Sequence, residues 1–375
     1  MFERIRHMLI KEFIQVFRDP RMRGVVFLIP CIEVLVIGYA VNMDVRHVLT
    51  AVYDLDQSEE SRELISRFVR SGCFDAVDYV GDDRQAQDVI DRGKAQIVLR
   101  VNHGFAADLH AGRTARVQAI LDGSDSNTAG IALSYATKIA GGYSRQILLD
   151  RSARLSGVAA MPAQLDLRTR AWFNENLDSR NYFVPGVIVI VVSLVSLLLT
   201  SMAVVREKEI GTIEQIMVTP ITPLEFILGK TMPFALISFV DVTLITLIGV
   251  FWFEVPIRGS IPLLYFATAL YMMTTLGIGL FISTVSQTQQ QAMMGTFFFF
   301  FPAMLLSGFS FPIANMPVPI QWLTRLNPVA YYLILVRSIF LKGIGVAFLW
   351  HELAALGLMG TVTLWLAVRR FHKTL

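Results

Sequence analysis

The chain has 375 residues, a formal net charge of +3, and only 17% charged against 54% hydrophobic residues. A soluble domain carries about 25% charged residues, and the shortage here is confined to one part of the chain. Residues 43–180 contain 36 charged side chains in 138 positions, whereas residues 181–375 contain 17 in 195. This distribution predicts a polar domain followed by a membrane domain. It excludes a cytosolic globular enzyme, a disordered chain and, because no basic surface is clustered, a nucleic-acid binder.

Six segments are predicted as membrane spans, since a helix needs about 20 mostly apolar residues to cross a bilayer. The first is residues 23–42, which we interpret as an uncleaved anchor. The segment before it is too long and too mixed in charge for a signal peptide. The other five are residues 182–205, 224–253, 262–285, 292–309 and 346–368. An even number of spans places both termini on one side of the membrane.

Basic residues lie at both ends of this arrangement. Six arginines and lysines lie before the first span or at its first residue, and Arg369, Arg370 and Lys373 follow the last. The positive-inside rule therefore predicts that both termini are cytoplasmic. The polar domain at residues 43–181 is then expected outside, because a domain of this length is translocated almost regardless of its own charge.

Residues 1–22 are predicted to form an amphipathic helix. Its apolar face is made of Phe2, Ile5, Leu9, Phe13, Val16 and Phe17. Three basic residues at seven-residue spacing lie opposite, while Arg6 and Glu12 interrupt the apolar side. We expect this helix to lie in the inner headgroup layer. Two roles remain open, namely anchoring alone and contact of the polar face with a cytoplasmic partner.

Residues 43–181 alternate between strand and helix patterns. The predicted strands are residues 49–55, 75–80, 95–101 and 116–121. The predicted helices are residues 58–70, 84–92, 103–110 and 124–155. Such alternation is typical of an α/β sandwich. The expected fold is a polytopic α-helical membrane protein with six transmembrane helices, an N-terminal interfacial helix and an inserted α/β extracytoplasmic domain.

The inserted domain carries no recognisable catalytic or metal-ligating constellation. His103 and His110 lack a third ligand, and residues 122–127 lack the spacing of a calcium loop. Cys31 lies in the first span and Cys73 in the polar domain, so the two cannot reach disulfide geometry. We therefore expect neither a metal site nor a catalytic residue.

The loop after the second span is charged in a half of the chain that is otherwise nearly uncharged. Residues 206–222 read REKEIGTIEQIMVTPIT. Gly211 separates the span from a predicted short helix at residues 212–217, and two Thr-Pro pairs end the segment because a residue before proline avoids helix. A short rigid helix that protrudes into the cytoplasm can transmit a push. The alternative is a plain solvated loop.

Three segments resemble the type-2 ATP-binding-cassette (ABC) export permeases that carry a large domain after the first span. REKEIGTIEQIMVTPI resembles their coupling segment, NLDSRNYFVPG (residues 176–186) their entry to the second span, and SGFSFPIANMP with LNPVAYYL (within residues 307–333) their extracellular re-entrant region. The resemblance implies that the permease pairs with a second copy or a paralogue, above ABC ATPase subunits that bind ATP and Mg. It places the ATPase contacts at Glu207, Lys208, Glu209, Gly211, Thr212, Glu214 and Gln215.

The chain itself is not expected to hydrolyse ATP. A P-loop needs the pattern G-x-x-x-x-G-K-[ST]. The nearest match ends in Gly229, Lys230 and Thr231, and it has Leu224 where the first glycine belongs. ATP hydrolysis must then come from a partner subunit.

Residues 311–342 are too polar and too rich in proline for a simple span. Short helices that dip in from outside would fit, because irregular backbone at membrane depth needs protein or water around it. In a paired permease this region would form an extracellular gate, made of Phe311, Pro312, Asn315, Pro317, Asn327, Pro328 and Tyr331. The alternative is a helical cap without a gating role.

Two acids, Glu33 and Asp241, fall at membrane depth. A charge there costs about 2.5–3.5 kcal/mol on insertion scales, so each should face protein or a cavity. They could belong to the translocation pathway, where they would attract a cationic substrate or carry a proton. They could equally be structural hydrogen-bonding groups between helices.

Together these features predict the permease subunit of an ATP-driven exporter in a bacterial inner membrane. The expected substrate is amphiphilic, such as a drug, a lipid or a glycoconjugate. Membrane lipids are expected partners, and the outer domain could contact a periplasmic adaptor protein. The alternatives are an ion-coupled secondary transporter that uses Glu33 and Asp241, and a membrane sensor or scaffold. The halves of the chain do not match each other as transporter repeats would, and co-purification with an ATPase would distinguish all three.

Overall fold

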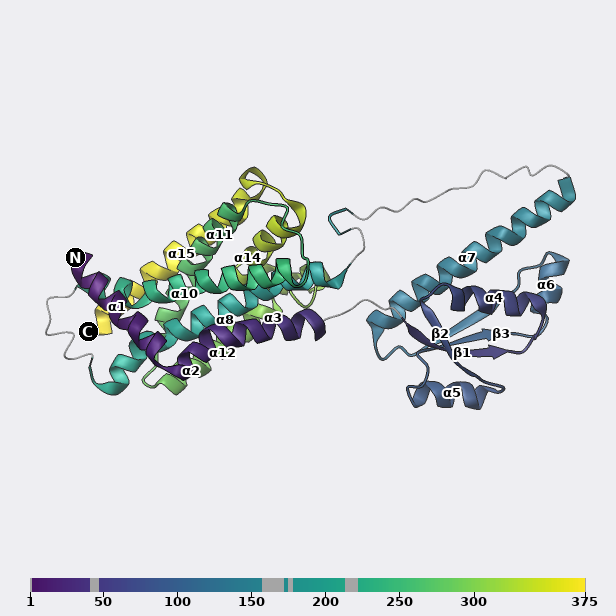
Figure 1. Cartoon of the computed structure of the whole chain (residues 1–375), viewed down its shortest axis with the longest axis horizontal. Coiled ribbons are helices and arrows are strands. Elements are labelled where there is room, and N and C mark those ends of the chain that lie inside the picture. The colour runs from purple at the N-terminus through teal and green to yellow at the C-terminus, as the bar shows by residue number, and fades with distance from the viewer. Residues whose placement is uncertain (1, 41–46, 157–171, 175–177, 213–221, 375) are drawn as a thin grey trace. The chain divides into compact units, whose positions relative to one another are not determined.

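The computed structural model describes residues 2–40, 47–156, 172–174, 178–212 and 222–374. Contacts within the chain divide it into two compact units, which are Met1–Asn42 with Arg170–Leu375, and Met43–Thr169. We call the first the membrane unit and the second the α/β unit. Helices make up the described part of the membrane unit, and the α/β unit contains a sheet with helices packed on it (Figure 1).

The α/β unit is built on a four-stranded sheet in the order β2-β1-β3-β4. Its strands are β1 (Val48–Asp54), β2 (Phe74–Tyr79), β3 (Ile97–Val101) and β4 (Val117–Leu121). β1 pairs in parallel with both β2 and β3, and β4 is antiparallel to β3. The helices are α4 (Glu59–Arg70), α5 (Asp83–Asp91), α6 (Phe105–Ala111) and α7 (Ser126–Ser156).

Alternation along β1 gives the sheet two buried faces. Val48 and Val52 belong to a core that also contains buried residues of α4, α6 and α7. Ala51 and Tyr53 point to the other face and pack with residues of α5, because successive strand residues project to opposite sides. Figure 1 shows the same division, with α4 and α7 on one side of the sheet and α5 on the other.

Polar side chains start the crossover helices where the sequence predicted. The Ser58 hydroxyl accepts a hydrogen bond from the Ser61 amide at 3.1 Å and caps α4, at the start of the helix predicted for residues 58–70. Asp82 caps α5 in the same way through the Gln85 amide at 2.7 Å. The third helix starts two residues later than predicted, because Gly104 takes a left-handed conformation with φ of 82° and stands as its N-cap.

The membrane unit begins with α1 (Phe2–Arg18), followed by α2 (Pro20–Arg23), the π-helical turn η1 (Gly24–Leu28) and α3 (Ile29–Ala40). After the α/β unit come the long helices α8, α10, α11, α12 and α15. Their bounds are Ser179–Ile210, Pro223–Phe251, Ile261–Val285, Gln289–Leu305 and Val346–Thr374. Between α12 and α15 lie η2 (Ile313–Asn315), α13 (Val318–Thr324), α14 (Pro328–Arg337) and η3 (Ser338–Lys342).

Four described helices are long and apolar enough, by length and composition, to cross a membrane. They are Ser179–Ile210, Glu225–Phe251, Ile261–Val285 and Val346–Arg370. The other two predicted spans correspond to shorter elements, the apolar helix Val26–Tyr39 and the 17-residue α12. α12 ends four residues before the predicted boundary, because the chain turns at Gly308, whose φ is 86°.

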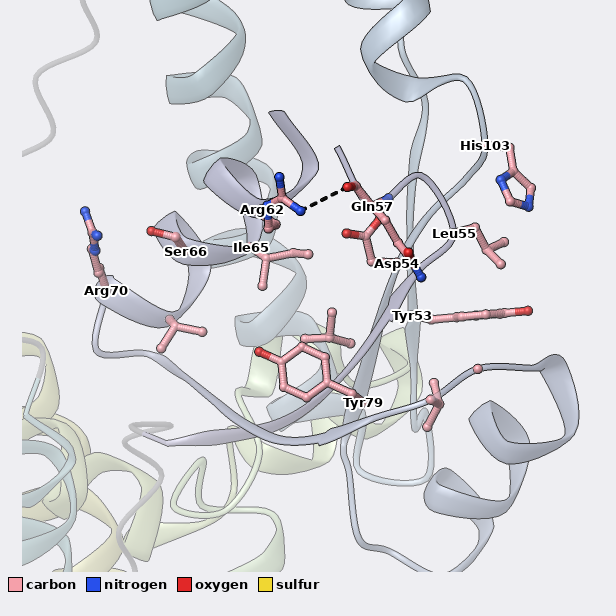
Figure 2. Close-up of a pocket in the computed structure, with 14 residues that line it drawn as sticks. Tyr53, Asp54, Leu55, Gln57, Arg62, Ile65, Ser66, Arg70, Tyr79 and His103 are labelled. Carbon is pink, nitrogen blue, oxygen red and sulfur yellow. Dashed lines mark hydrogen bonds between the residues drawn. The ribbon is translucent and has the colours of Figure 1, made fainter. Parts of the chain in front are cut away.

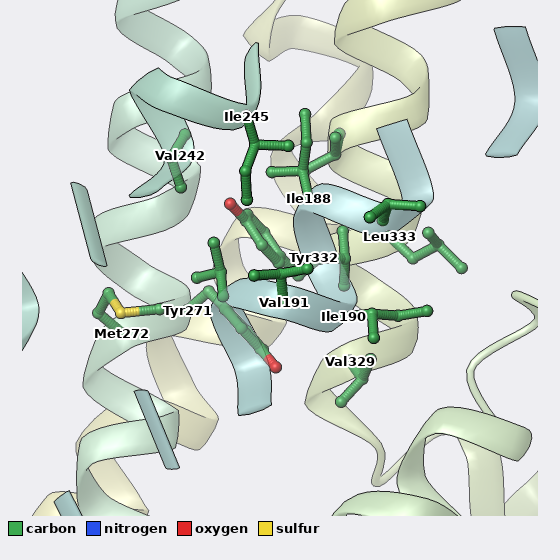
Figure 3. Packing of buried hydrophobic residues seen from close by; sticks show 14 of the residues in the cluster. Ile188, Ile190, Val191, Val242, Ile245, Tyr271, Met272, Val329, Tyr332 and Leu333 are labelled. Atoms are coloured by element: carbon green, nitrogen blue, oxygen red, sulfur yellow. The ribbon is translucent and has the colours of Figure 1, made fainter. Parts of the chain in front are cut away.

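Helix α8 forms the buried centre of the membrane unit, and its core-facing side chains pack around two stacked tyrosines (Figure 3). The rings of Tyr271 on α11 and Tyr332 on α14 lie 4.3 Å apart between centroids and 9° from parallel. Both hydroxyls are hydrogen-bonded, Tyr271 with Ser193 and Tyr332 with Thr268. The stack therefore joins three helices without leaving its buried hydroxyls unpaired.

Small residues let the long helices approach closely. A Cβ added at Gly277 on α11 would lie 2.7 Å from the Leu364 backbone nitrogen on α15. One added at Gly279 would lie 2.8 Å from the Cβ of Thr200 on α8. Both glycines therefore allow close helix packing.

Candidate functional site

Three buried charged residues meet where α1, the end of α8 and the start of α10 come together. The ammonium of Lys230 lies 2.6 Å from Glu12 Oε1 and 2.5 Å from Glu207 Oε1. All three residues are at most 5% exposed. Lys11, which is itself exposed, approaches Glu207 Oε1 at 3.5 Å. We call Glu12, Glu207 and Lys230 the ionic cluster, and it fastens α1 to two long helices of the membrane unit.

The ionic cluster explains why an acid interrupts the apolar side of α1. Glu12 and Val16 are buried against the unit, whereas Ile10, Ile14 and Phe17 are 44%, 56% and 50% exposed. The predicted apolar face is therefore divided, since Val16 faces protein and Phe17 faces outward. Glu12 and Lys11 make polar contacts within this chain, and the two roles considered for α1 stay predictions.

The predicted coupling residues that the structure describes hold several helix ends together. The Lys208 ammonium donates to the Thr284 carbonyl of α11 at 2.9 Å. The Glu209 carboxylate accepts from the backbone and side-chain nitrogens of Gln289 at 3.2 and 2.8 Å, so it holds the first residue of α12, which Thr288 caps. Thr212 donates its hydroxyl to Glu207. One turn of α8 is thus bonded to α10, α11 and α12.

The coupling segment leaves this turn through a glycine. Gly211 has φ of 81° and ends α8 in a left-handed conformation, which a side chain would disfavour. Beyond it lie the predicted short helix at residues 212–217 and, within that helix, Glu214 and Gln215. Apart from Thr212, they fall outside the described residues. Their role as ATPase contacts therefore stays a prediction.

The two predicted intramembrane acids have different surroundings. Asp241 on α10 is fully buried, and within the described ranges neither of its carboxylate oxygens has a hydrogen-bond partner. Glu33 on α3 is only half-buried. No hydrogen bond or ion pair joins these two acids in the described part of the chain. Asp241 is the stronger candidate for a functional group, because an unpaired buried carboxylate costs stability.

The predicted re-entrant region consists of short helices, as expected from its prolines. Asn327 caps α14 by accepting from the Val329 amide at 3.1 Å, and it donates its amide to the Ala303 carbonyl of α12 at 2.6 Å. The Tyr331 hydroxyl donates to the Arg325 carbonyl at 2.9 Å. Pro328 is buried with Asn327, whereas the remaining predicted gate residues are exposed, namely Phe311, Pro312, Asn315 and Pro317.

An apolar hollow of about 310 Å³ lies where α12 meets α13 and α14. Its walls include Phe298, Leu323 and Leu326, which are 85%, 52% and 74% exposed. Asn327 and Pro328, two of the predicted gate residues, line its inner side. The structure thus brings part of the predicted gate together around a surface suited to apolar groups.

A family model described as "ABC-2 family transporter protein" matches residues 21–369. The chain belongs to the ABC-2 transporter family. The resemblance seen in three short segments therefore extends over nearly the whole sequence of this ABC-2 permease.

Bacterial relatives are similar over most of their length. "Probable multidrug ABC transporter permease YbhR" of Escherichia coli (strain K12) is 34% identical over 353 residues, which cover 94% of each chain. "Probable multidrug ABC transporter permease YbhS" of the same strain is 32% identical over 345 residues, covering 91% of this chain and 89% of the relative. "Inner membrane transport permease YhhJ" is 29% identical over 333 residues, covering 87% and 85%.

Two features of this ABC-2 permease were missed by sequence reasoning. The pairing of Glu12 with Lys230 was not predicted, although each is a lone charge in an apolar setting and could have signalled a buried partner. The contacts of Arg337 were not predicted either: its guanidinium lies 3.6 Å from the centre of the Tyr182 ring and donates to the Gly308 carbonyl at 3.2 Å.

Replacing Asp241 by leucine is expected to raise the thermal stability of the permease. An unsatisfied buried polar group costs about 1–3 kcal/mol, and an apolar side chain of similar size removes that cost. Thermal unfolding in lipid nanodiscs measures the effect, with Asp241→Asn as the matched polar control. A lower unfolding temperature for Asp241→Leu would contradict the claim that the buried carboxylate of Asp241 lacks a partner and costs stability. The control variant Asp241→Asn can also be tested for export. If it loses export of neutral and cationic substrates equally, Asp241 does not recognise the charge of the substrate.

Proposed function

We propose that this chain is the permease subunit of an ABC exporter in a bacterial inner membrane, driven by separate ATPase subunits that bind ATP and Mg. The family match over residues 21–369 carries the proposal. Relatives named multidrug permeases support an amphiphilic substrate, such as a drug, a lipid or a glycoconjugate. In this proposal the first predicted span, residues 23–42, and α12 complete six spans, and both termini are cytoplasmic.

The proposed ATPase contact is the coupling segment, residues 206–222. Glu209 and Gly211 are exposed and can meet a partner directly. Glu207 is buried, so its proposed part is to anchor the segment to α1 and α10 through the ionic cluster. A displacement of the segment would then reach α12 through Glu209 and α11 through Lys208. Glu214 and Gln215 complete the proposed contact.

The proposed exit lies at the short helices between α12 and α15. A second copy of the chain, or a paralogue, would complete it, and the exposed gate residues would open as the coupling segment moves. The α/β unit, placed in the periplasm by the predicted orientation, is the proposed contact for an adaptor protein. The apolar hollow beside Asn327 supports this placement of the exit, since it offers an apolar surface to a leaving amphiphile.

Substitution of Glu209 by alanine is expected to lower substrate-stimulated ATP hydrolysis several-fold in the assembled complex. The variant removes both hydrogen bonds from Glu209 to the first residue of α12, and it removes an exposed charge from the proposed contact. The measurement compares basal and stimulated ATPase activity of permease and ATPase co-purified into nanodiscs. Glu254→Ala is the matched control, because Glu254 is an exposed acid beyond the end of α10.

Unchanged stimulation with Glu209→Ala would remove this residue from the proposed contact. Failure of any ATPase to co-purify would remove the proposed function itself. The second candidate, an ion-coupled transporter, is favoured by the unpaired carboxylate of Asp241. Export that follows a proton gradient in the absence of an ATPase, and that stops with Asp241→Asn, would support that candidate instead.

A further inference from the structure

A hollow of about 910 Å³ opens at the carboxyl ends of the three parallel strands of the α/β unit (Figure 2). It is lined by Leu55 and Gln57 after β1, by Val80 and Gly81 after β2, and by His103 after β3. In open parallel sheets, ligands bind in the crevice outside the carboxyl ends of the strands. Its volume lies in the range of small-molecule sites.

The floor and one wall of the hollow are apolar. Val52 and Val80 are buried beneath it, and Ile65 on α4 closes one side. Tyr79 and Val69 are 71% and 42% exposed at its edge. Large exposed apolar side chains around a concave surface are characteristic of binding sites rather than of ordinary surface.

The same helix, α4, also carries a row of hydrogen-bond donors along the hollow. Arg62, Ser66 and Arg70 recur at four-residue spacing, so they lie on one side of the helix. Figure 2 shows all three along α4, together with Ile65. Arg62 donates to the Gln57 carbonyl at 3.1 Å, which orients its guanidinium at the hollow.

The acid that lines the hollow does not cancel these charges by an ion pair. Asp54 Oδ1 accepts from the amides of Asp56 and Gln57 at 3.1 and 3.0 Å. Its Oδ2 accepts from the Ser61 hydroxyl at 2.7 Å. The two arginines that line the hollow, Arg62 and Arg70, outnumber this one internally bonded carboxylate.

Asp56 fixes the rim by joining the loops after β1 and β3. Its carboxylate accepts from the amides of Gly104, Phe105 and Ala106 at 2.7, 3.1 and 3.0 Å. A hydrogen bond with the Ser58 side chain and these three amides hold the pKa of Asp56 below its ordinary value. The hollow is therefore held open in the folded unit and needs little rearrangement to accept a ligand.

We propose that this hollow is a binding site for a small amphiphilic anion. The acidic head group lies against the donor row of Arg62, Ser66 and Arg70, and the apolar body lies on Ile65, Val69 and Tyr79. The site belongs to the α/β unit alone, so it is independent of the proposed ATPase contact and of the exit. It gives this unit a ligand-sensing or ligand-holding role in addition to any protein contact.

The test uses the full chain in nanodiscs and a hexyl phosphate that carries a diazirine at the end of its alkyl chain. After photolysis, peptide mapping is expected to find the label on α4 and β2. Excess unlabelled hexyl phosphate added before photolysis should prevent this labelling, while hexyltrimethylammonium and hexanol should not. Inorganic phosphate should compete only at concentrations about tenfold higher or more, since burial of several methylene groups adds more than 1.4 kcal/mol.

Two variants separate the two halves of the site. The double variant Arg62→Gln, Arg70→Gln is expected to lower labelling about tenfold, because it removes charge-assisted hydrogen bonds. Tyr79→Ser is expected to weaken the binding of hexyl phosphate while leaving the binding of inorganic phosphate unchanged. Arg84→Gln, an exposed arginine on α5 that does not line the hollow, is the matched control. Hydrogen exchange of β1 peptides verifies that each variant is folded.

Several outcomes would overturn the proposal. One is equal labelling by a cationic probe of the same length. Another is unchanged labelling in the double arginine variant. Equal competition by inorganic phosphate would reduce the hollow to a simple anion site. Because this assay measures binding without nucleotide or ATPase, its failure leaves the proposed export function untouched.

Discussion

Replacing Lys230 by methionine is expected to destabilise the membrane unit by about 3–5 kcal/mol, which is the usual cost of removing one partner from a buried ion pair. The substitution leaves Glu12 and Glu207 buried, close together and without their common cation. Lys11 cannot replace it, since it approaches Glu207 only at 3.5 Å and from an exposed position. We expect α1 to detach from α8 and α10.

Thermal unfolding and hydrogen exchange of α1 measure this effect. Lys342→Met, at an exposed lysine of the same unit, is the matched control and should change little. The triple variant Glu12→Gln, Glu207→Gln, Lys230→Met should recover most of the stability, because no buried charge remains. Equal unfolding temperatures for Lys230→Met and Lys342→Met would show that the ionic cluster contributes nothing measurable.

The second large effect is expected at the contact between α11 and α15. Gly277→Ala places a Cβ 2.6 Å from the Thr363 hydroxyl oxygen and 2.7 Å from the Leu364 backbone nitrogen. Backbone cannot move aside as the end of a side chain can, so the two helices must separate. Overpacking of this kind costs about 1–3 kcal/mol, and export should fall with it.

The same substitution one helix away supplies the control. A Cβ added at Gly357 on α15 would meet only the Leu270 side chain, at the ordinary contact distance of 3.8 Å. Gly357→Ala should therefore be neutral or slightly stabilising, as alanine favours helix over glycine. If the two alanine variants unfold at the same temperature, the close approach at Gly277 does not determine stability.

Local signals allowed the secondary structure of the α/β unit to be predicted. The strand predicted at residues 95–101 is observed as Ile97–Val101, and the helix predicted at residues 58–70 as Glu59–Arg70. Side-chain alternation and N-caps act over a few residues, so one sequence contains them. Strand order was not predicted, because pairing depends on contacts between distant segments.

The same limit applies to the candidate sites. Glu12 and Lys230 are 218 positions apart, and only the packing of α1 on α10 brings their side chains together. The hollow of the α/β unit is made by loops that follow three different strands. By contrast, the charged turn at Glu207 to Glu209 stood out as a single run in an apolar half of the chain, although its contacts with three helices did not.

That turn has a consequence for the evolution of the segment. Consecutive side chains of α8, Glu207, Lys208 and Glu209, reach the ionic cluster, α11 and α12 in that order. A single inserted or deleted residue just before the turn would rotate all three by about 100° around the helix axis. Each would then face the wrong neighbour at once. Substitutions can be accommodated one bond at a time, but the length of α8 up to this point is fixed.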